Sequence, residues 1–228
     1  MLLALDTVFS ACSVALADKT GTILAARHLE QSRGQAETLV PMAQEVLREA
    51  AIQPNQITQI AVTAGPGTFA GVRIGVAFAR TLALPTGAEV LGISSFEALA
   101  GAVILDKANS RNLNILAVMP GKRGEVSVTL FAGLGGGSFP PDVLKAPENI
   151  PLEDLKTWVG KRQGIVIGPN AADLEGLSGF DVIALWITAE QLVKIAQLFP
   201  KNSFQATVSP FYLRAPDAKP QKSPFSRV

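Results

Sequence analysis

Short apolar runs separated by turn residues fill the first part of the chain. The run Leu2–Leu5 is wholly apolar and ends at Asp6, and two longer runs follow at residues 11–17 and 22–28. Apolar runs of four to eight residues bounded by polar or turn residues are typical of buried strands. The Lys-Thr-Gly turn at residues 19–21 joins the last two runs, so the pattern predicts three strands, of which two form a hairpin.

From Gln35 onward the hydrophobic period becomes that of a helix. Apolar residues recur at intervals of three and four positions over residues 35–51, which places them on one helical face. The elements predicted next are a strand (57–63), a helix (71–84), a strand (89–93) and a helix (97–105) capped by Ser94 and Ser95. Three strands followed by alternating helices and strands predict an α/β fold with a mixed sheet of the ribonuclease H-like kind.

The second half repeats this organisation in a weaker form. Strands are predicted near 113–118, 125–131, 164–167 and 182–185, helices near 152–159 and 189–198, and a glycine- and proline-rich loop at 133–141. We therefore expect a ribonuclease H-like lobe over residues 1–107 and a smaller, degenerate lobe over residues 108–213. Residues 214–228 carry three prolines and four basic residues against one acid, which predicts a disordered basic tail that either frays or contacts RNA or a partner.

Composition narrows the class of protein. Apolar residues make up 48% of the chain and charged residues 17%, which fits either a large buried sheet or a surface covered by a partner. The formal net charge of +1 gives no field that would steer nucleic acid to the isolated chain. Cys12 and His28 are the only residues of their types, which argues against a disulfide framework and a zinc cluster and favours a reducing cytoplasm.

The apolar N-terminal stretch has to be distinguished from a targeting segment. No basic residue precedes the apolar run and Asp6 interrupts it, so we do not expect a secretory signal. No run of about 18 uncharged apolar residues occurs elsewhere, so a membrane span is not expected either.

The densest motif is Gly65–Gly75, Gly-Pro-Gly-Thr-Phe-Ala-Gly-Val-Arg-Ile-Gly, between a predicted strand and a predicted helix. Glycines let backbones approach closely, and the N–H groups at a helix start can hold an anion, so helix packing and phosphate binding both have to be considered. The Lys-Ser or Lys-Thr pair of a P-loop is absent. A dinucleotide fingerprint is disfavoured because its acidic candidate, Glu89, begins a strand instead of ending one. Packing is the favoured interpretation for most of these glycines.

A degenerate phosphate site is the functional alternative for this region, and its candidate residues are Asp6, Thr7, Gly65, Gly67 and Arg73. Asp6 follows the first strand, where a carboxylate could hold Mg²⁺ near phosphates with the hydroxyls of Ser10 and Ser13 nearby, although an Asp at a strand end also commonly forms a turn. The sequence supplies no obvious second carboxylate. A Ser/His/Asp triad would need His28, and no Gly-x-Ser-x-Gly elbow is present, so His28 is predicted to lie on the sheet surface.

Several segments, in their order and spacing, resemble the TsaB (YeaZ) family. They are Leu3–Thr7, Ala11–Leu16, Arg33-Gly34, the Gly65–Gly75 block, Gly124–Val126 and Tyr212–Arg214. The resemblance spans nearly the whole chain and implies an actin-like ATPase (ASKHA) fold of two ribonuclease H-like lobes, the second reduced. It also implies a non-catalytic subunit that pairs with a TsaD-like catalytic subunit and a TsaE-like ATPase. That complex transfers a threonylcarbamoyl group from an adenylate to the adenosine beside the anticodon of tRNA.

The resemblance further implies that ATP and metal belong to the partner subunits and that this chain has no cofactor of its own. TsaD-like subunits carry a His-x-x-x-His metal motif, which a chain with one histidine lacks. The nearest analogue of their Gly-Gly-x-x-x-Asn adenosine motif is Gly168-Pro169-Asn170, with proline in place of the second glycine. Gln35, Pro120 and Ser127 stand where the family commonly has histidine, aspartate and tyrosine.

In the family, the paired surface comes from the first two helices, here about residues 35–51 and 71–84. The resemblance makes the following residues candidate partner contacts: Met42, Val46, Gly71, Val76 and Arg80. The alternative is that Val46 and Val76 face the sheet. Two other functions stay open at this point: a stand-alone actin-like ATPase or peptidase-like enzyme, and a homodimer that uses the same helical surface when no partner is present.

Overall fold

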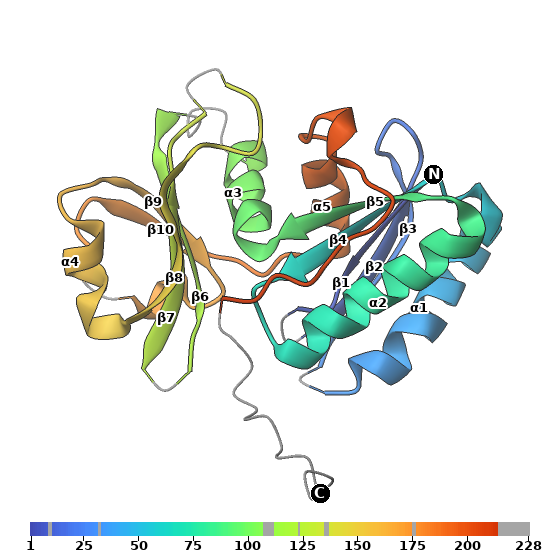
Figure 1. The fold of residues 1–228 in the computed structure, drawn as a ribbon, viewed down its shortest axis with the longest axis horizontal. Coiled ribbons are helices and arrows are strands. Elements are labelled where there is room, and N and C mark those ends of the chain that lie inside the picture. The colour runs from blue at the N-terminus through green and yellow to red at the C-terminus, as the bar shows by residue number, and fades with distance from the viewer. Residues whose placement is uncertain are drawn as a thin grey trace, which may run out of the picture.

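Two five-stranded sheets stand side by side in the computed structural model, which describes residues 1–8, 11–31, 33–106, 112–122, 124–134, 137–174 and 177–213 (Figure 1). The strand order in the first sheet is β3-β2-β1-β4-β5. Its strands are β1 (Leu2–Asp6), β2 (Ala11–Ala17), β3 (Ile23–Glu30), β4 (Gln59–Gly65) and β5 (Glu89–Ser94). β1 pairs antiparallel with β2 and parallel with β4, so the sheet is mixed, as the sequence predicted.

The helices that alternate with these strands along the chain are α1 (Gln35–Glu49), α2 (Phe69–Thr86) and α3 (Ser95–Asp106). Thr68 caps α2, which ends at Gly87 in the left-handed conformation. Ser94 caps α3, as predicted: its hydroxyl accepts from the Glu97 N–H while the Glu97 carboxylate accepts from the Ser94 N–H. α1 and α2 cover one face of the sheet, and α3 lies between the two sheets (Figure 1).

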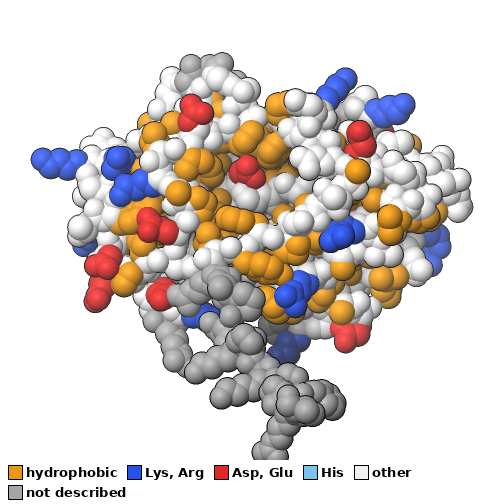
Figure 2. Space-filling view, in the orientation of Figure 1, with side chains coloured by type: hydrophobic (Ala, Val, Ile, Leu, Met, Phe, Trp, Pro, Cys, Tyr) orange, Lys and Arg blue, Asp and Glu red, His pale blue; other side chains and the backbone are white. Residues whose placement is uncertain are grey.

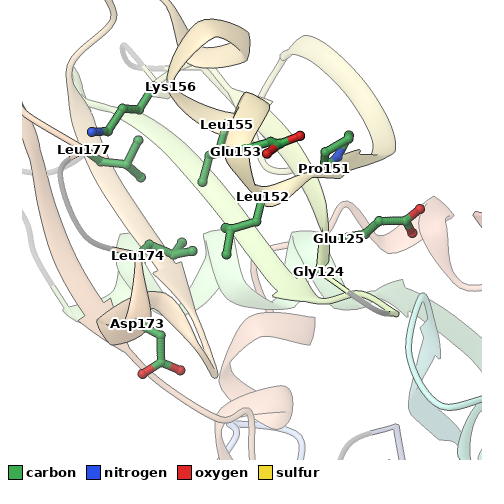
Figure 3. Close-up of a pocket in the computed structure, with 10 residues that line it drawn as sticks. All are labelled: Gly124, Glu125, Pro151, Leu152, Glu153, Leu155, Lys156, Asp173, Leu174 and Leu177. Atoms are coloured by element: carbon green, nitrogen blue, oxygen red, sulfur yellow. The ribbon is translucent and has the colours of Figure 1, made fainter.

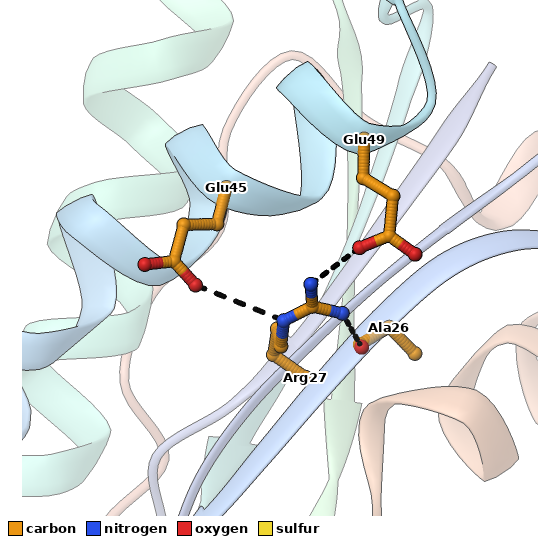
Figure 4. Close-up of polar contacts among 4 residues, drawn as sticks. All are labelled: Ala26, Arg27, Glu45 and Glu49. Carbon is orange, nitrogen blue, oxygen red and sulfur yellow. Dashed lines mark hydrogen bonds and ion pairs between the residues drawn. The ribbon is translucent and has the colours of Figure 1, made fainter.

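A small ion-pair cluster links α1 to the edge strand β3. The Arg27 guanidinium lies between Glu45 and Glu49 of α1 and donates to the Ala26 carbonyl (Figure 4). All three charged side chains are about half exposed, so water screens the pairs and each stabilises by no more than about 1 kcal/mol. Burial of one leucine such as Leu39 on the inner face of α1 is worth about 2 kcal/mol, so apolar packing holds the helix.

The second sheet has the strand order β10-β9-β6-β7-β8. Its strands are β6 (Asn114–Pro120), β7 (Glu125–Phe131), β8 (Val143–Pro151), β9 (Gly164–Gly168) and β10 (Phe180–Ala184), with helices α4 (Leu155–Val159) and α5 (Ala189–Ala196). In each sheet the first strand is central, flanked by the second and third on one side and the fourth and fifth on the other. This is the ribonuclease H-like order, so the predicted actin-like α/β fold of two such units is confirmed.

The sequence did not predict the edge strand β8. Residues 143–151 contain Pro147 and Pro151 and are exposed along most of their length. Proline lacks the N–H group that a central strand needs, but it is tolerated at a sheet edge, where β8 lies. Pairing with β7 and a hydrogen bond from the Thr129 hydroxyl to the Lys145 carbonyl (2.8 Å) hold the strand in place.

Helix α5 returns to the first sheet. α5 packs on β1 and β2, on the face opposite α1 and α2. The Ser13 hydroxyl on β2 accepts a hydrogen bond from the Ala189 N–H at the start of α5 (3.0 Å). Elements from both halves therefore share one continuous hydrophobic core.

Residues 204–213, here called the C-terminal strap, then cross the first sheet beside α2. Gln205 forms a bridge with Val90 on the edge strand β5. Further along, the Phe211 N–H donates to the Ala64 carbonyl at the end of β4 (2.7 Å). The strap thus covers the free edge of β5 and ends next to the glycine-rich block.

Two predictions from the sequence concern residues that the structure does not describe. They are the lobe boundary near residue 107 and the tail from residue 214. Among the residues that are described, no helix is long and apolar enough to cross a membrane.

Candidate functional site

Asp6, the leading acidic candidate, ends β1 with a completely buried side chain. It pairs across the sheet with Ser13, which meets the start of α5, so its carboxyl lies on the α5 face. Neither carboxyl oxygen makes a well-formed hydrogen bond with any described residue. Burial raises the pKa of Asp6 to about 7, although the nearby Thr63 hydroxyl and Val8 N–H favour the charged form.

The surroundings of Asp6 do not fit a nucleotide–Mg²⁺ site. The carboxyl has no open face, and the Ser13 hydroxyl already binds α5. Burial, and secondarily the charge of Asp6, raise the pKa of Cys12 to about 11, so this thiol stays neutral at physiological pH. Within the described ranges, no group of three or more His, Cys, Asp or Glu side chains is placed to hold a metal ion. His28 is exposed on β3, as predicted, and Ser10 lies outside the described residues.

Thr7 connects the end of β1 to the glycine-rich block on the opposite face of the sheet. Its hydroxyl donates to the Gly71 carbonyl (2.7 Å). A Cβ on Gly71 would lie 1.9 Å from the Thr7 carbonyl oxygen, and one on Gly75 would lie 2.6 Å from the Thr7 hydroxyl oxygen. Because a backbone oxygen cannot move aside cheaply, glycine at position 71 is what lets α2 approach β1 this closely.

The glycines on either side of Pro66 also serve packing. Gly65 has a φ of 101°, and a Cβ there would meet the Phe211 carbonyl oxygen of the C-terminal strap at 2.5 Å. A Cβ on Gly67 would lie 2.0 Å from a methyl carbon of Val8. Of the four glycines in the block, Gly71 and Gly75 therefore pack the helix onto the sheet, while Gly65 and Gly67 make close contacts with the C-terminal strap and with Val8.

Arg73 lies on the exposed side of α2, whereas the Asp6 carboxyl lies on the other face of the sheet. The guanidinium of Arg73 stacks on Phe69 and donates to the Tyr212 hydroxyl. The five residues considered for a degenerate phosphate site therefore do not converge on one place, which corrects that alternative.

The predicted partner contacts divide into buried and exposed positions. The side chains of Met42, Val46 and Val76 are buried in the core, and Gly71 is buried against the end of β1. Arg80 is exposed. The expectation that the three apolar side chains contact a partner is corrected, because side chains packed inside one chain offer no surface to another.

Sequence reasoning overlooked apolar residues on the outer side of the same helices. Val40 on α1 is 47% exposed, Leu84 on α2 is 84% exposed, and Ala77 is exposed between Arg73 and Leu84. We refer to Val40, Ala77, Arg80 and Leu84 as the outer α1–α2 face. A surface helix usually has one apolar side, whereas α2 has apolar residues all around and no acidic residue. This pattern in the sequence could have indicated that the outer side of α2 is also apolar.

Three positions that depart from the family pattern have local structural roles. Gln35 is buried at the start of α1 and donates to the Gln31 carbonyl (3.1 Å). Ser127 on β7 donates to the Asn149 side chain on the neighbouring strand β8. Pro120 ends β6 and is exposed.

A hollow of about 870 Å³ lies in the second lobe. Leucines form much of its wall and carboxylates stand around them (Figure 3). The lining residues are Gly124, Glu125, Pro151, Leu152, Glu153, Leu155, Lys156, Asp173, Leu174 and Leu177. Among the described lining residues, Glu125, Glu153 and Asp173 carry carboxylates and Lys156 carries an amine, so both apolar and charged groups surround the hollow.

Comparison with known proteins extends the resemblance seen in the motifs. The family model "TsaD: tRNA N6-adenosine threonylcarbamoyltransferase" matches residues 23–137. The Escherichia coli tRNA threonylcarbamoyladenosine biosynthesis protein TsaB is 32% identical over 224 residues, which cover 93% of this chain and 94% of the relative. The Haemophilus influenzae protein of the same name is 36% identical over 55% of this chain and 51% of its own length.

Solved structures agree with these relatives. YeaZ from Pseudomonas aeruginosa superposes with a TM-score of 0.70 at 26% identity, over 86% of this chain and 90% of that one. A Pseudomonas aeruginosa protein described as uncharacterized with similarity to peptidase YEAZ gives a TM-score of 0.76 at 26% identity, over 93% and 99% of the two chains.

The paired ribonuclease H-like sheets and the glycine-rich junction define an actin-like protein related to the threonylcarbamoyltransferase domain. The relatives that match nearly the full length of the chain identify a particular family within that class. The chain belongs to the TsaB (YeaZ) family of tRNA threonylcarbamoyladenosine biosynthesis proteins. The family predicted from the motifs is thereby confirmed.

Proposed function

We propose that this chain is a non-catalytic scaffold subunit that binds a TsaD-like catalytic subunit through the outer α1–α2 face. Together with a TsaE-like ATPase it supports threonylcarbamoyl transfer to tRNA in the cytoplasm. The observation that carries the proposal is the exposed apolar surface of α2. Figure 2 shows hydrophobic side chains across this side of the molecule, with basic side chains among them. Apolar patches of this kind on a folded chain mark interaction surfaces.

The composition of the outer α1–α2 face suits a helix-to-helix contact. Leu84 and Val40 supply apolar area, at about 25 cal/mol for each Å² removed from water, and the small Ala77 allows a partner helix to approach closely. Arg80 can pair with a carboxylate of the partner at the margin of the contact. The match of this chain to a TsaD family model suggests that the partner shares its fold, which favours pairing of equivalent helices.

The environment of Asp6 supports a non-catalytic role. A fully buried carboxyl cannot contact a phosphate-bound metal ion unless α5 moves away from the sheet. The neighbouring Cys12 is protonated and buried, so it is a poor nucleophile.

The proposal is tested with Ala77→Asp and Leu84→Asp, singly and combined. The control is Val182→Asp, which places the same carboxylate on a valine of β10 that is also exposed. Calorimetric titration with the TsaD-like protein of the same organism should show at least about ten-fold weaker binding for the double variant, because a carboxylate at an apolar contact is costly to desolvate. The control should bind like wild type.

The outcomes separate the alternatives. Melting temperatures close to wild type show that the variants are folded. Wild-type affinity in the double variant would refute this interface, and ATP turnover or peptidase activity by the isolated chain would refute the scaffold role. Light scattering of the chain with and without partner distinguishes a heterodimer from self-association.

A further inference from the structure

Phe69, Arg73 and Tyr212 form an exposed aromatic–arginine cluster at the start of α2. The guanidinium carbon of Arg73 lies 3.7 Å from the Phe69 ring centroid, and Arg73 Nε donates to the Tyr212 hydroxyl (2.9 Å). The two ring centroids lie 5.5 Å apart, with the rings tilted by 33°. Tyr212 belongs to the C-terminal strap, so residues 139 positions apart build one cluster.

Arg73 is held in one orientation but keeps most of its donors. Stacking on Phe69 fixes the guanidinium plane, and Tyr212 occupies Nε. The two Nη groups make no hydrogen bond or ion pair within the described part of the chain. A guanidinium that presents both Nη groups to solvent matches two oxygens of a phosphate or a carboxylate. The cluster is therefore a preoriented anion receptor beside a half-exposed aromatic ring.

The surroundings favour a nucleic acid over an acidic peptide. No acidic residue occurs between Glu49 and Glu89, a stretch that contains all of α2. The sequence after Leu213 carries four basic residues against one acid. A peptide carboxylate would use the guanidinium and leave the rings unused, whereas a single-stranded nucleic acid offers a phosphate to the arginine and a base to stack on an aromatic face.

We propose that the Phe69–Arg73–Tyr212 cluster binds a single-stranded segment of RNA, with a phosphate on Arg73 and a base stacked on the open face of Phe69. The inference rests on the proposed function, since a subunit that acts in tRNA modification encounters an RNA with unpaired bases. Because the net charge of the chain is only +1, the cluster makes a local contact with RNA. Its role is to orient RNA that the partner also binds.

The test measures binding of a fluorescently labelled anticodon stem–loop by anisotropy, both to the complex with the TsaD-like protein and to the isolated chain. Phe69→Ala removes the stacking ring, and Arg73→Lys keeps the charge but loses the fork. Each should weaken RNA binding about ten-fold. Tyr212→Phe keeps the ring and frees Nε, and should weaken it about two- to five-fold. Arg48→Lys, at an exposed arginine of α1, is the matched control and should bind like wild type.

Each outcome decides the question. Equal RNA affinity in wild type, Phe69→Ala and Arg73→Lys, in complex and alone, overturns the inference. If the variants lose affinity for the TsaD-like protein and not for RNA, the cluster is a protein contact and the inference is also overturned. Failure of the proposed function appears separately, as absence of the complex, and leaves the isolated-chain measurement valid. Melting temperatures confirm folding, and Arg73→Lys decides if Phe69→Ala does not fold.

Discussion

Replacing Asp6 with asparagine should stabilise the protein at neutral and alkaline pH. The Asp6 carboxyl is completely buried, and its pKa is raised from the ordinary 3.8 to about 7 in the folded chain. Because folding raises the pKa, the folded state favours the protonated carboxyl. The stability linked to Asp6 is therefore fully present below about pH 4 and is lost as the pH rises towards about 7.

The magnitude follows from the size of the pKa shift. A shift of about three units at 1.36 kcal/mol per unit corresponds to about 4 kcal/mol, of which about 2–3 kcal/mol falls between about pH 5 and pH 8. Asparagine has the same shape but no charge to desolvate. The free energy of unfolding of Asp6→Asn should therefore not fall over this pH range, and at about pH 8 it should exceed that of the wild type by up to about 4 kcal/mol.

Urea unfolding, followed by the fluorescence of the two tryptophans, measures the free energy of unfolding of the wild type and of the variant at each pH. Asp18→Asn is the matched control. Asp18 is exposed, and hydrogen bonds lower its pKa, chiefly one from the Thr20 hydroxyl and then one from the Thr20 N–H. The Asp18 carboxyl is therefore ionised in the folded and the unfolded chain between about pH 5 and pH 8. The control variant should keep the wild-type pH dependence. If Asp6→Asn loses as much stability as wild type between about pH 5 and pH 8, burial of a titrating carboxyl is not the cause.

Three further predictions concern the packing. Gly71→Ala should cost at least about 3 kcal/mol in urea unfolding because its Cβ would meet a backbone oxygen at 1.9 Å, while Gly87→Ala, with φ of 66° and open space around it, should cost only about 1–2 kcal/mol. Val76→Asp should unfold the protein, as seen by circular dichroism, whereas Ala77→Asp should fold because that side chain is exposed; equal melting temperatures would contradict the assigned helix face. Ser13→Ala removes the acceptor for the N–H at the start of α5 and should cost about 1 kcal/mol, and no change in the unfolding midpoint would show that this contact is not formed.

Much of the first lobe could be predicted because its hydrophobic periods are strong. Leu2–Leu5 is uniformly apolar since β1 is central and covered on both faces, and α1 shows a clear helical face. β8 could not be predicted, because strand pairing with β7 overrides the poor local propensity of Pro147 and its neighbours.

The site was harder to predict than the fold for a physical reason. A helix that is apolar all around, such as α2, does not reveal which side faces inward, so Val76 was expected at a surface and Ala77 was overlooked. Contacts between segments that are distant in the sequence also cannot be read from the local pattern of hydrophobic and polar residues. The hydrogen bond from Arg73 to the Tyr212 hydroxyl depends on the path of the C-terminal strap, which only the folded chain defines.

The return of α5 to the first sheet has a consequence for biosynthesis. β1 and β2 leave the ribosome early, but the helix that covers one of their faces comes from residues 189–196. At about 5–20 residues per second, translation of the intervening chain takes roughly 10 to 40 s. During that interval the apolar face of the nascent sheet is not covered by α5, so this protein should engage co-translational chaperones until α5 is made.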